Sequence, residues 1–87
     1  MSKALTAKIK LEFPVTISGI EVDHLTMRRP KVRDEIVLSK SKGDDADKEL
    51  GYIASLCEVA PEDLHELDSA DYQRLLGQLA DFRGAKS

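Results

Sequence analysis

The sequence predicts a small α+β fold, in which an N-terminal β-hairpin is followed by three to four helices in the order ββααα. Two changes of pattern carry this prediction. From Ala7 to Ile17 apolar and polar residues alternate, which is the period of a half-buried strand. Beyond Pro30 apolar residues recur every three to four positions, as in an amphipathic helix. The 87 residues contain no long linker, so residues 1–87 are expected to form a single domain.

The hairpin is expected over residues 7–28. Ser18-Gly19 separates the two alternating runs and predicts a tight turn, because glycine reaches positive φ without steric cost. In the second strand the alternation slips across Asp23-His24, so we expect a β-bulge there. Pro14 cannot donate a ladder hydrogen bond, which favours a free edge or an irregularity at that point of the first strand.

The helical part is expected over residues 30–83, with flexible ends at residues 1–6 and 84–87. Pro30 suits the first position of a helix, where its missing N–H costs nothing. The individual helices are expected near residues 30–41, 46–59, 61–66 and 69–83.

One core is expected between the hairpin and the helices, because an isolated two-stranded hairpin is marginal in water. The apolar periodicity selects its members. The side chains expected to be mostly buried are Phe13, Leu25, Met27, Ile36, Ile53, Cys57, Leu64, Leu75 and Leu79.

The composition, 41% apolar and 33% charged, is typical of a soluble globular protein. The net charge of −3 hides an asymmetry: residues 1–43 carry +4 (nine Lys/Arg, five Asp/Glu) and residues 44–87 carry −7 (four against eleven). The two halves either attract each other, within a monomer or a homo-oligomer, or simply solvate their own surfaces. No apolar run has a membrane helix's length, and the N-terminus does not read as a secretory signal. A lone cysteine, Cys57, favours a reducing cytoplasm.

Residues that could carry chemistry form no recognisable pattern. Cys57 and His65 could act as nucleophile and base, but Cys57 lies on the apolar stripe of its helix. No Cys or His pair has metal-ligand spacing, and the glycines form no phosphate-binding loop. We therefore expect no enzymatic activity, no cofactor and no metal.

Two groups of residues are candidates for binding a partner. Tyr52 and Leu56 extend the second helix's apolar surface beyond one stripe, so this face either receives a partner or is also core. The cluster of Arg28, Arg29 and Arg33 could bind phosphates or an acidic partner, or be a solvated surface. Because the chain is acidic overall, with a pI near 5.3, nucleic acid is the less favoured partner.

Residues 14–34 read PVTISGIEVDHLTMRRPKVRD, and residues 53–75 read IASLCEVAPEDLHELDSADYQRL. The first segment contains a strand ending in Pro-Val, a Gly turn, Leu-Thr-Met-Arg before Arg-Pro, and an Asp four residues beyond that Pro. The second contains Pro-Glu-Asp-Leu and an Asp-Tyr pair that opens the last helix. In these features the chain resembles the tail assembly chaperone family of Mu-like contractile-tailed bacteriophages. The resemblance covers about 70 of the 87 residues, and none of its motifs is catalytic.

This resemblance implies a chaperone that binds the long helical tape measure protein and keeps it soluble during tail morphogenesis. It implies action in the host bacterial cytoplasm and absence from the mature virion. A longer form of the chain, which many such proteins make by ribosomal frameshifting, is a further expected partner, and a membrane is not. The alternative function is a small nucleic-acid-associated regulatory protein that uses the basic cluster Arg28–Arg33.

Overall fold

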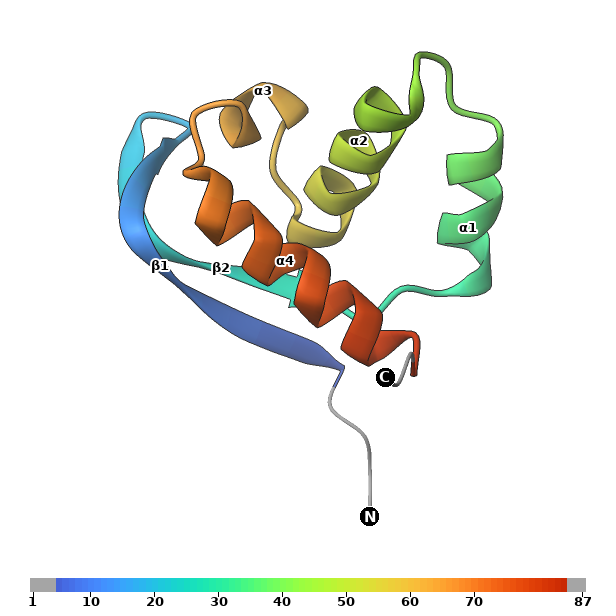
Figure 1. The fold of residues 1–87 in the computed structure, drawn as a ribbon, viewed down its shortest axis with the longest axis horizontal. Coiled ribbons are helices and arrows are strands. Elements are labelled where there is room, and N and C mark those ends of the chain that lie inside the picture. Colours follow the sequence, from blue (N-terminus) through green and yellow to red (C-terminus); the bar gives the residue numbers. More distant parts are fainter. Residues whose placement is uncertain (1–4, 85–87) are drawn as a thin grey trace.

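The computed structural model of the protein describes residues 5–84 and has the predicted order of a hairpin followed by helices (Figure 1). This confirms the predicted fold class. The flexible ends expected at residues 1–6 and 84–87 lie mainly outside the described residues, although Thr6 already belongs to the first strand. The elements are β1 (Thr6–Ile17), β2 (Ile20–Arg28), α1 (Val32–Ser39), α2 (Asp45–Cys57), α3 (Pro61–Leu64) and α4 (Ser69–Phe82).

The two strands form an antiparallel sheet, and the helices cover one of its faces (Figure 1). α4 packs on β1, α2 packs on β2, and the short α3 lies against α2 and β1. α1 stands at the edge of the molecule, where it packs against α2 (Figure 1). The sheet, α2, α3 and α4 therefore form the scaffold, and α1 is attached to its side.

The hairpin turn follows the prediction. Ile17 pairs with Ile20, and the two residues between them have positive φ, 52° at Ser18 and 83° at Gly19. Positive φ at both central residues is the turn geometry that matches the twist of the flanking strands.

The prediction of a β-bulge in the second strand at Asp23-His24 is wrong, because the extra residues that shift the register lie in β1. Lys10 pairs with His24 and Val15 pairs with Val22, so the four residues 11–14 of β1 face Asp23 alone. Pro14 lies within this irregular segment, as its missing N–H predicts.

Asp71 of α4 explains how β1 tolerates this irregularity. Its fully buried carboxylate accepts hydrogen bonds from the backbone N–H groups of Glu12 (3.0 Å) and Phe13 (3.1 Å). Arg74 donates to the same carboxylate at 2.7 Å. These bonds, first of all the one from Glu12, hold the pKa of Asp71 below its usual range. The backbone groups released from the ladder are thus satisfied from α4.

Phe13 was expected in the core, and that prediction is wrong, because its side chain is 56% exposed. The alternation holds at Leu11 and Val15, which are buried on either side of it. Between them the backbone turns its N–H groups toward Asp71 instead of toward β2. The local loss of strand pairing therefore removes Phe13 from the buried face.

Aspartates begin two of the helices. Asp44 accepts from the N–H of Asp47 at 2.9 Å, and Asp68 accepts from the N–H of Ala70 at 3.0 Å. The first helix does not start at Pro30 as expected but at Val32, with Lys31 as its N-cap.

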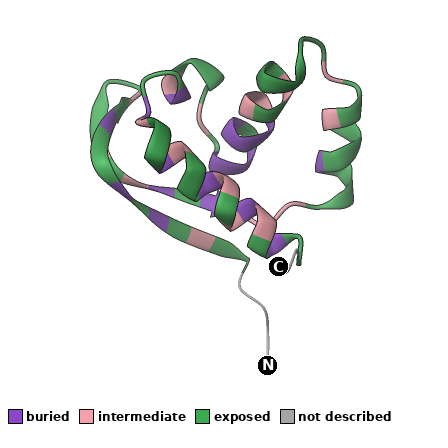
Figure 2. Cartoon of the chain, in the orientation of Figure 1, coloured by how far each residue is buried: buried purple, intermediate pink, exposed green. Residues whose placement is uncertain are grey.

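The core fills the space between the sheet and the scaffold helices (Figure 2). Within residues 5–84, no helix combines the length and apolar character needed to cross a membrane. Of the expected core residues, those that the structure buries are Leu25, Met27, Ile53, Cys57, Leu64, Leu75 and Leu79.

Candidate protein-binding surface

α1 is turned opposite to the orientation that its sequence predicts. Three of its four large apolar side chains face solvent, with exposed fractions of 76% for Val32, 49% for Ile36 and 67% for Val37, while Leu38 packs against the core. Its one buried residue is Asp34. The prediction that Ile36 belongs to the core is therefore wrong, and Figure 2 shows α1 as mostly exposed.

The buried Asp34 anchors the start of α1 to the end of β2. Both of its carboxylate oxygens accept from the guanidinium of Arg28, at 2.9 and 2.8 Å, and one also accepts from the backbone N–H of Lys31 at 2.8 Å. The Arg28 hydrogen bonds hold the pKa of Asp34 well below its usual range. A bidentate arginine–carboxylate pair is strongly directional, so it fixes which side of α1 faces the scaffold.

Glu35 provides a second anchor, to α2 and to the end of α4. Its carboxylate accepts from the hydroxyl of Tyr52 and from Arg83, whose Nη2 lies 2.8 and 2.7 Å from the two oxygens. The hydrogen bond from Tyr52, followed by that from Arg83, lowers the pKa of Glu35. The Arg83 guanidinium also lies over the Tyr52 ring, 5.2 Å from its centroid.

These two anchors explain why α1 exposes its apolar side. The helix has eight residues, so it is too short to be stable alone and depends on tertiary contacts. Asp34 and Glu35 occupy the side that faces the scaffold, which leaves Val32, Ile36 and Val37 on the outside. Three large apolar side chains on one short helix form a surface suited to contact with another protein.

The residues predicted to bind a partner on the second helix are not accessible. Leu56 is fully buried and Tyr52 is 7% exposed. Both apolar faces of α2 thus belong to the core, which was the alternative interpretation. The physical reason is that α2 lies between β2 and α1 and is covered on both sides.

The structure brings the predicted arginines to one place but leaves them unequally available. Arg28 is engaged by Asp34, and the guanidinium of Arg29 lies 5.3 Å from the centroid of the Phe82 ring. Arg33, on α1, is exposed. A depression of about 300 Å³ lies beside the start of α1, and its lining residues are Leu5, Thr6, Arg28, Arg29, Lys31 and Arg33.

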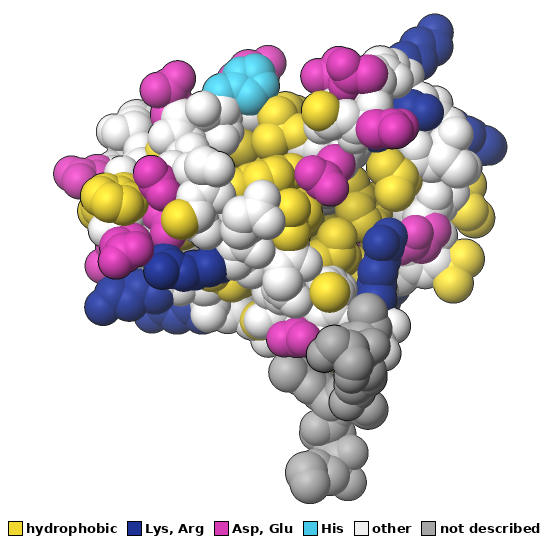
Figure 3. All heavy atoms as spheres, in the orientation of Figure 1, with side chains coloured by type: hydrophobic (Ala, Val, Ile, Leu, Met, Phe, Trp, Pro, Cys, Tyr) yellow, Lys and Arg dark blue, Asp and Glu magenta, His cyan; other side chains and the backbone are white. Residues whose placement is uncertain are grey.

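A groove of about 370 Å³ lies on the other side of α1, among α1, α2 and α4. Leu38, Tyr52 and Leu79 provide its apolar lining, and its charged lining includes Lys48 and Glu49. In Figure 3 hydrophobic side chains gather between α2 and α4 in the middle of this face, and others protrude at the edge over α1. Hydrophobic side chains also protrude at the opposite edge, over the hairpin (Figure 3).

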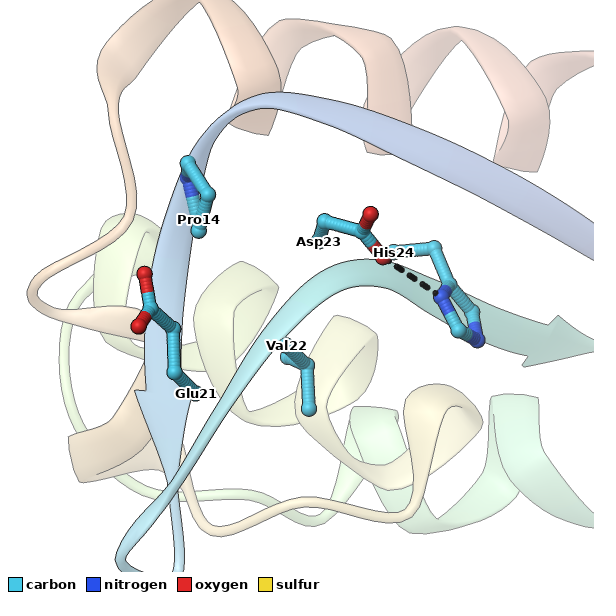
Figure 4. A pocket seen from close by; sticks show the side chains of 5 residues that line it. All are labelled: Pro14, Glu21, Val22, Asp23 and His24. Atoms are coloured by element: carbon cyan, nitrogen blue, oxygen red, sulfur yellow. Dashed lines mark hydrogen bonds and ion pairs between the residues drawn. The ribbon is translucent and has the colours of Figure 1, made fainter.

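A further hollow of about 460 Å³ lies at the irregular part of the hairpin (Figure 4). Its lining includes Pro14 from β1 and His24 from β2. Nδ1 of His24 lies 3.1 Å from Oδ1 of the neighbouring Asp23, and the two side chains form an exposed pair (Figure 4). An exposed pair of this kind contributes little energy.

Of the two residues considered for chemistry, Cys57 lies in an unreactive setting. Cys57 is buried, and burial raises the pKa of its thiol to about 11, which suppresses the nucleophilic thiolate. His65 is exposed on the short turn after α3. Among residues 5–84, no group of three His, Cys, Asp or Glu side chains is placed to hold a metal ion.

An anchored helix with an exposed apolar face, carried on a well-packed scaffold, is a candidate surface for contact with another protein. Residues 8–84 match the family described as phage tail assembly chaperone proteins, E, or 41 or 14, and the chain belongs to this family. The resemblance carried by residues 14–34 and 53–75 is confirmed. No curated protein and no solved structure matches the chain. Membership in a chaperone family suggests a non-enzymatic role.

The exposed face of α1 was missed by sequence reasoning, although a signal for it exists. Arg28 and Asp34 flank Pro30 at a distance that permits the anchoring ion pair. Once that pair is assumed, Asp34 must face the scaffold, and helical geometry then places Val32 and Ile36, each two residues from Asp34, on the opposite side.

Proposed function

We propose that the protein is a non-enzymatic chaperone that binds the tape measure protein of its phage and keeps it soluble during tail morphogenesis. The observation that supports this proposal most directly is the outward apolar side of α1, formed by Val32, Ile36 and Val37. Together with membership in a tail assembly chaperone family, it supports a protein as the ligand.

The chemistry of such a client fits this surface. Before the tail tube forms around it, a long helical protein exposes apolar stripes that would cause aggregation if left uncovered. A chaperone that covers them needs a modest apolar contact that can be released, and not a deep pocket. Because apolar contacts depend little on salt, we expect the affinity to change less than about tenfold between about 0.1 and 1 M NaCl.

A nucleic-acid role receives less support from the same residues. Binding through phosphates needs several available cations and shows a steep salt dependence. Arg28 is already paired with Asp34, and Arg29 lies over Phe82. The basic cluster thus offers fewer available cations than its sequence suggests.

The remaining parts of the proposal concern setting and partners. We propose that the protein acts in the host bacterial cytoplasm and is absent from the mature virion. A frameshifted longer form of the chain would present the same domain to the same client. Self-association is not needed for the proposed activity.

Co-expression with the tape measure protein encoded by the same phage tests the proposal. We expect the client to move from the pellet to the soluble fraction and to be retained by affinity-tagged chaperone. An unrelated aggregating helical protein serves as the control and should stay in the pellet. A client that remains insoluble and is not retained by the chaperone would contradict the proposed function.

A further inference from the structure

We propose that the outer face of α1 is the docking site for an amphipathic helix of the client whose apolar stripe is flanked by Asp and Glu. This inference rests on the proposed function and adds the surface and the chemistry of the docking segment. The outer face of α1 is defined by Val32, Ile36 and Val37 together with the basic residues Arg33 and Lys40.

The distribution of exposed apolar side chains selects this face. Every large exposed hydrophobic residue within residues 5–84 lies in the first 37 positions. Three of the six, Val32, Ile36 and Val37, are concentrated on α1. The other three are Leu5, just before β1, and Phe13 and Ile20 on the hairpin. Val32 and Ile36 are four residues apart and so lie one above the other on the helix, and Val37 is exposed to one side of them. Such a row suits a second helix laid along it.

The charges around this row favour an acidic partner. The acidic residues of α1, Asp34 and Glu35, are paired with Arg28 and Arg83 on the scaffold side. Arg33 and Lys40 are exposed on α1 and just beyond its end. The exposed Lys31 lines the depression beside the start of α1 and adds a further positive charge. A client helix with carboxylates beside its apolar stripe would therefore meet opposite charge at both ends of α1.

A second copy of the chain fits this face poorly. Two α1 helices packed on each other would bring Arg33 and Lys40 of each copy close to the same residues of the other. The acidic half of the chain offers complementary charge, but none of its described residues (44–84) is a large exposed hydrophobic side chain. A second copy can therefore provide either opposite charge for Arg33 and Lys40 or an apolar surface for Val32, Ile36 and Val37, but not both at once.

The anchors of α1 give the site a fixed shape before the client arrives. Asp34 with Arg28, and Glu35 with Tyr52 and Arg83, connect α1 to the strand and helices beside it. A preformed helix surface loses little conformational entropy on binding, which favours affinity.

The first test replaces the apolar row with polar residues that still favour helix. In Ile36→Gln/Val37→Gln two of the three exposed apolar side chains become polar, while Val32 and the anchors at Asp34 and Glu35 remain. The matched control is Ile20→Gln, which removes an equally exposed apolar side chain from the hairpin. We expect the double variant to keep its circular dichroism and thermal midpoint, and to bind the client roughly tenfold or more weakly. Ile20→Gln should bind as the unmodified protein does.

The probe for affinity is a set of overlapping synthetic peptides that covers the tape measure protein. The peptides that bind should be amphipathic with acidic flanks, and Arg33→Glu/Lys40→Glu should weaken them. Replacing their flanking Asp and Glu by Lys should restore binding to the charge-reversed chaperone. If the double Gln variant does not fold, Ile36→Gln alone provides the same comparison.

The outcomes separate this inference from the proposed function. If the unmodified protein does not solubilise or retain the client, the function itself is wrong. If the unmodified protein and Ile36→Gln/Val37→Gln bind the client equally well, the function stands and the docking site is wrong. Binding restricted to peptides without acidic flanks would contradict the proposed partner chemistry, as would self-association that depends on Ile36.

Discussion

α1 and α4 both have amphipathic sequences, yet the fold uses them in opposite ways. α4 buries its apolar side, with Leu75 fully covered and Leu79 and Phe82 nearly so. α1 directs its acids and Leu38 toward the scaffold, and Val32, Ile36 and Val37 outward. The comparison shows that apolar spacing predicts a helix well but does not determine which side of it faces the protein.

Length and anchoring account for the difference. α4 has 14 residues, so its apolar stripe spans the sheet and the hydrophobic effect decides its orientation. α1 has eight residues and only a small apolar surface to bury, so the Arg28–Asp34 pair and the Glu35 contacts decide its orientation. An apolar surface that the fold does not need for its own core remains available to a partner.

The largest expected difference between the two helices is in stability. Leu75→Ala should lower the free energy of unfolding by about 2–5 kcal/mol, because it leaves a cavity at a fully buried site. Ile36→Ala should cost less than about 1 kcal/mol, because Ile36 is half exposed. Urea unfolding of both variants measures this directly. Equal costs would mean that α1 belongs to the core after all.

Asp71 tests whether α4 also supports the irregular part of β1. The backbone N–H groups of Glu12 and Phe13 each donate to a different carboxylate oxygen of Asp71. Asp71→Asn replaces one of these oxygens with an NH2 group, so one of the two N–H groups loses its acceptor. We expect the thermal midpoint to fall by roughly 5–15 °C. The control is Asp81→Asn on the same helix, where the side chain is exposed and the midpoint should not move. A midpoint unchanged in Asp71→Asn would contradict the assigned role of this carboxylate.

Low pH should destabilise the attachment of α1 and the packing of α4 on β1, because both depend on buried or hydrogen-bonded carboxylates. The folded-state pKa values of Asp34, Glu35 and Asp71 are depressed, so their stabilisation is present above the unfolded pKa near 4. It is lost as the pH falls below about 4 and these groups become protonated. Thermal unfolding measured from about pH 7 to 2 should therefore show stability falling mainly at the acidic end. In Asp34→Asn the acid dependence should become shallower, and an unchanged profile would contradict the anchoring role.

The smallest expected effect concerns the end of α2, in the scaffold that both helices share. Glu58 has a φ of 58°, in the left-handed region that suits glycine. Glu58→Gly should therefore raise the free energy of unfolding by about 0.5–1 kcal/mol. This gain is the backbone strain that glycine relieves in the folded state, minus the cost of the greater conformational freedom that glycine gives the unfolded chain. Glu58→Ala retains the β-carbon and should give no gain. A loss of stability in Glu58→Gly would show that the side chain contributes more than its backbone strain costs.

The parts of the fold that local pattern determines could be predicted from the sequence. The hairpin turn at Ser18-Gly19 follows from backbone preferences, and the order of the helices follows from the apolar spacing beyond Pro30. The family could also be recognised, because its features occur in order along the chain.

The features that depend on long-range polar contacts could not be predicted. The outward position of Phe13 depends on Asp71, which lies 58 residues away in the chain. The outward side of α1 depends on Glu35 finding Tyr52 and Arg83. Tyr52 and Leu56 looked like surplus apolar surface because the sequence does not reveal that α2 is covered on two sides.

Methyl NMR of the protein during titration with a client peptide tests the central claim most directly. The account predicts chemical-shift changes at the methyl groups of Val32, Ile36 and Val37. The buried methyl groups of Ile53 and Leu75 should stay unchanged, because the scaffold is already packed. Shifts confined to Ile20 on the hairpin or to Leu79 in the groove between α1 and α4, with Ile36 and Val37 unaffected, would contradict the account.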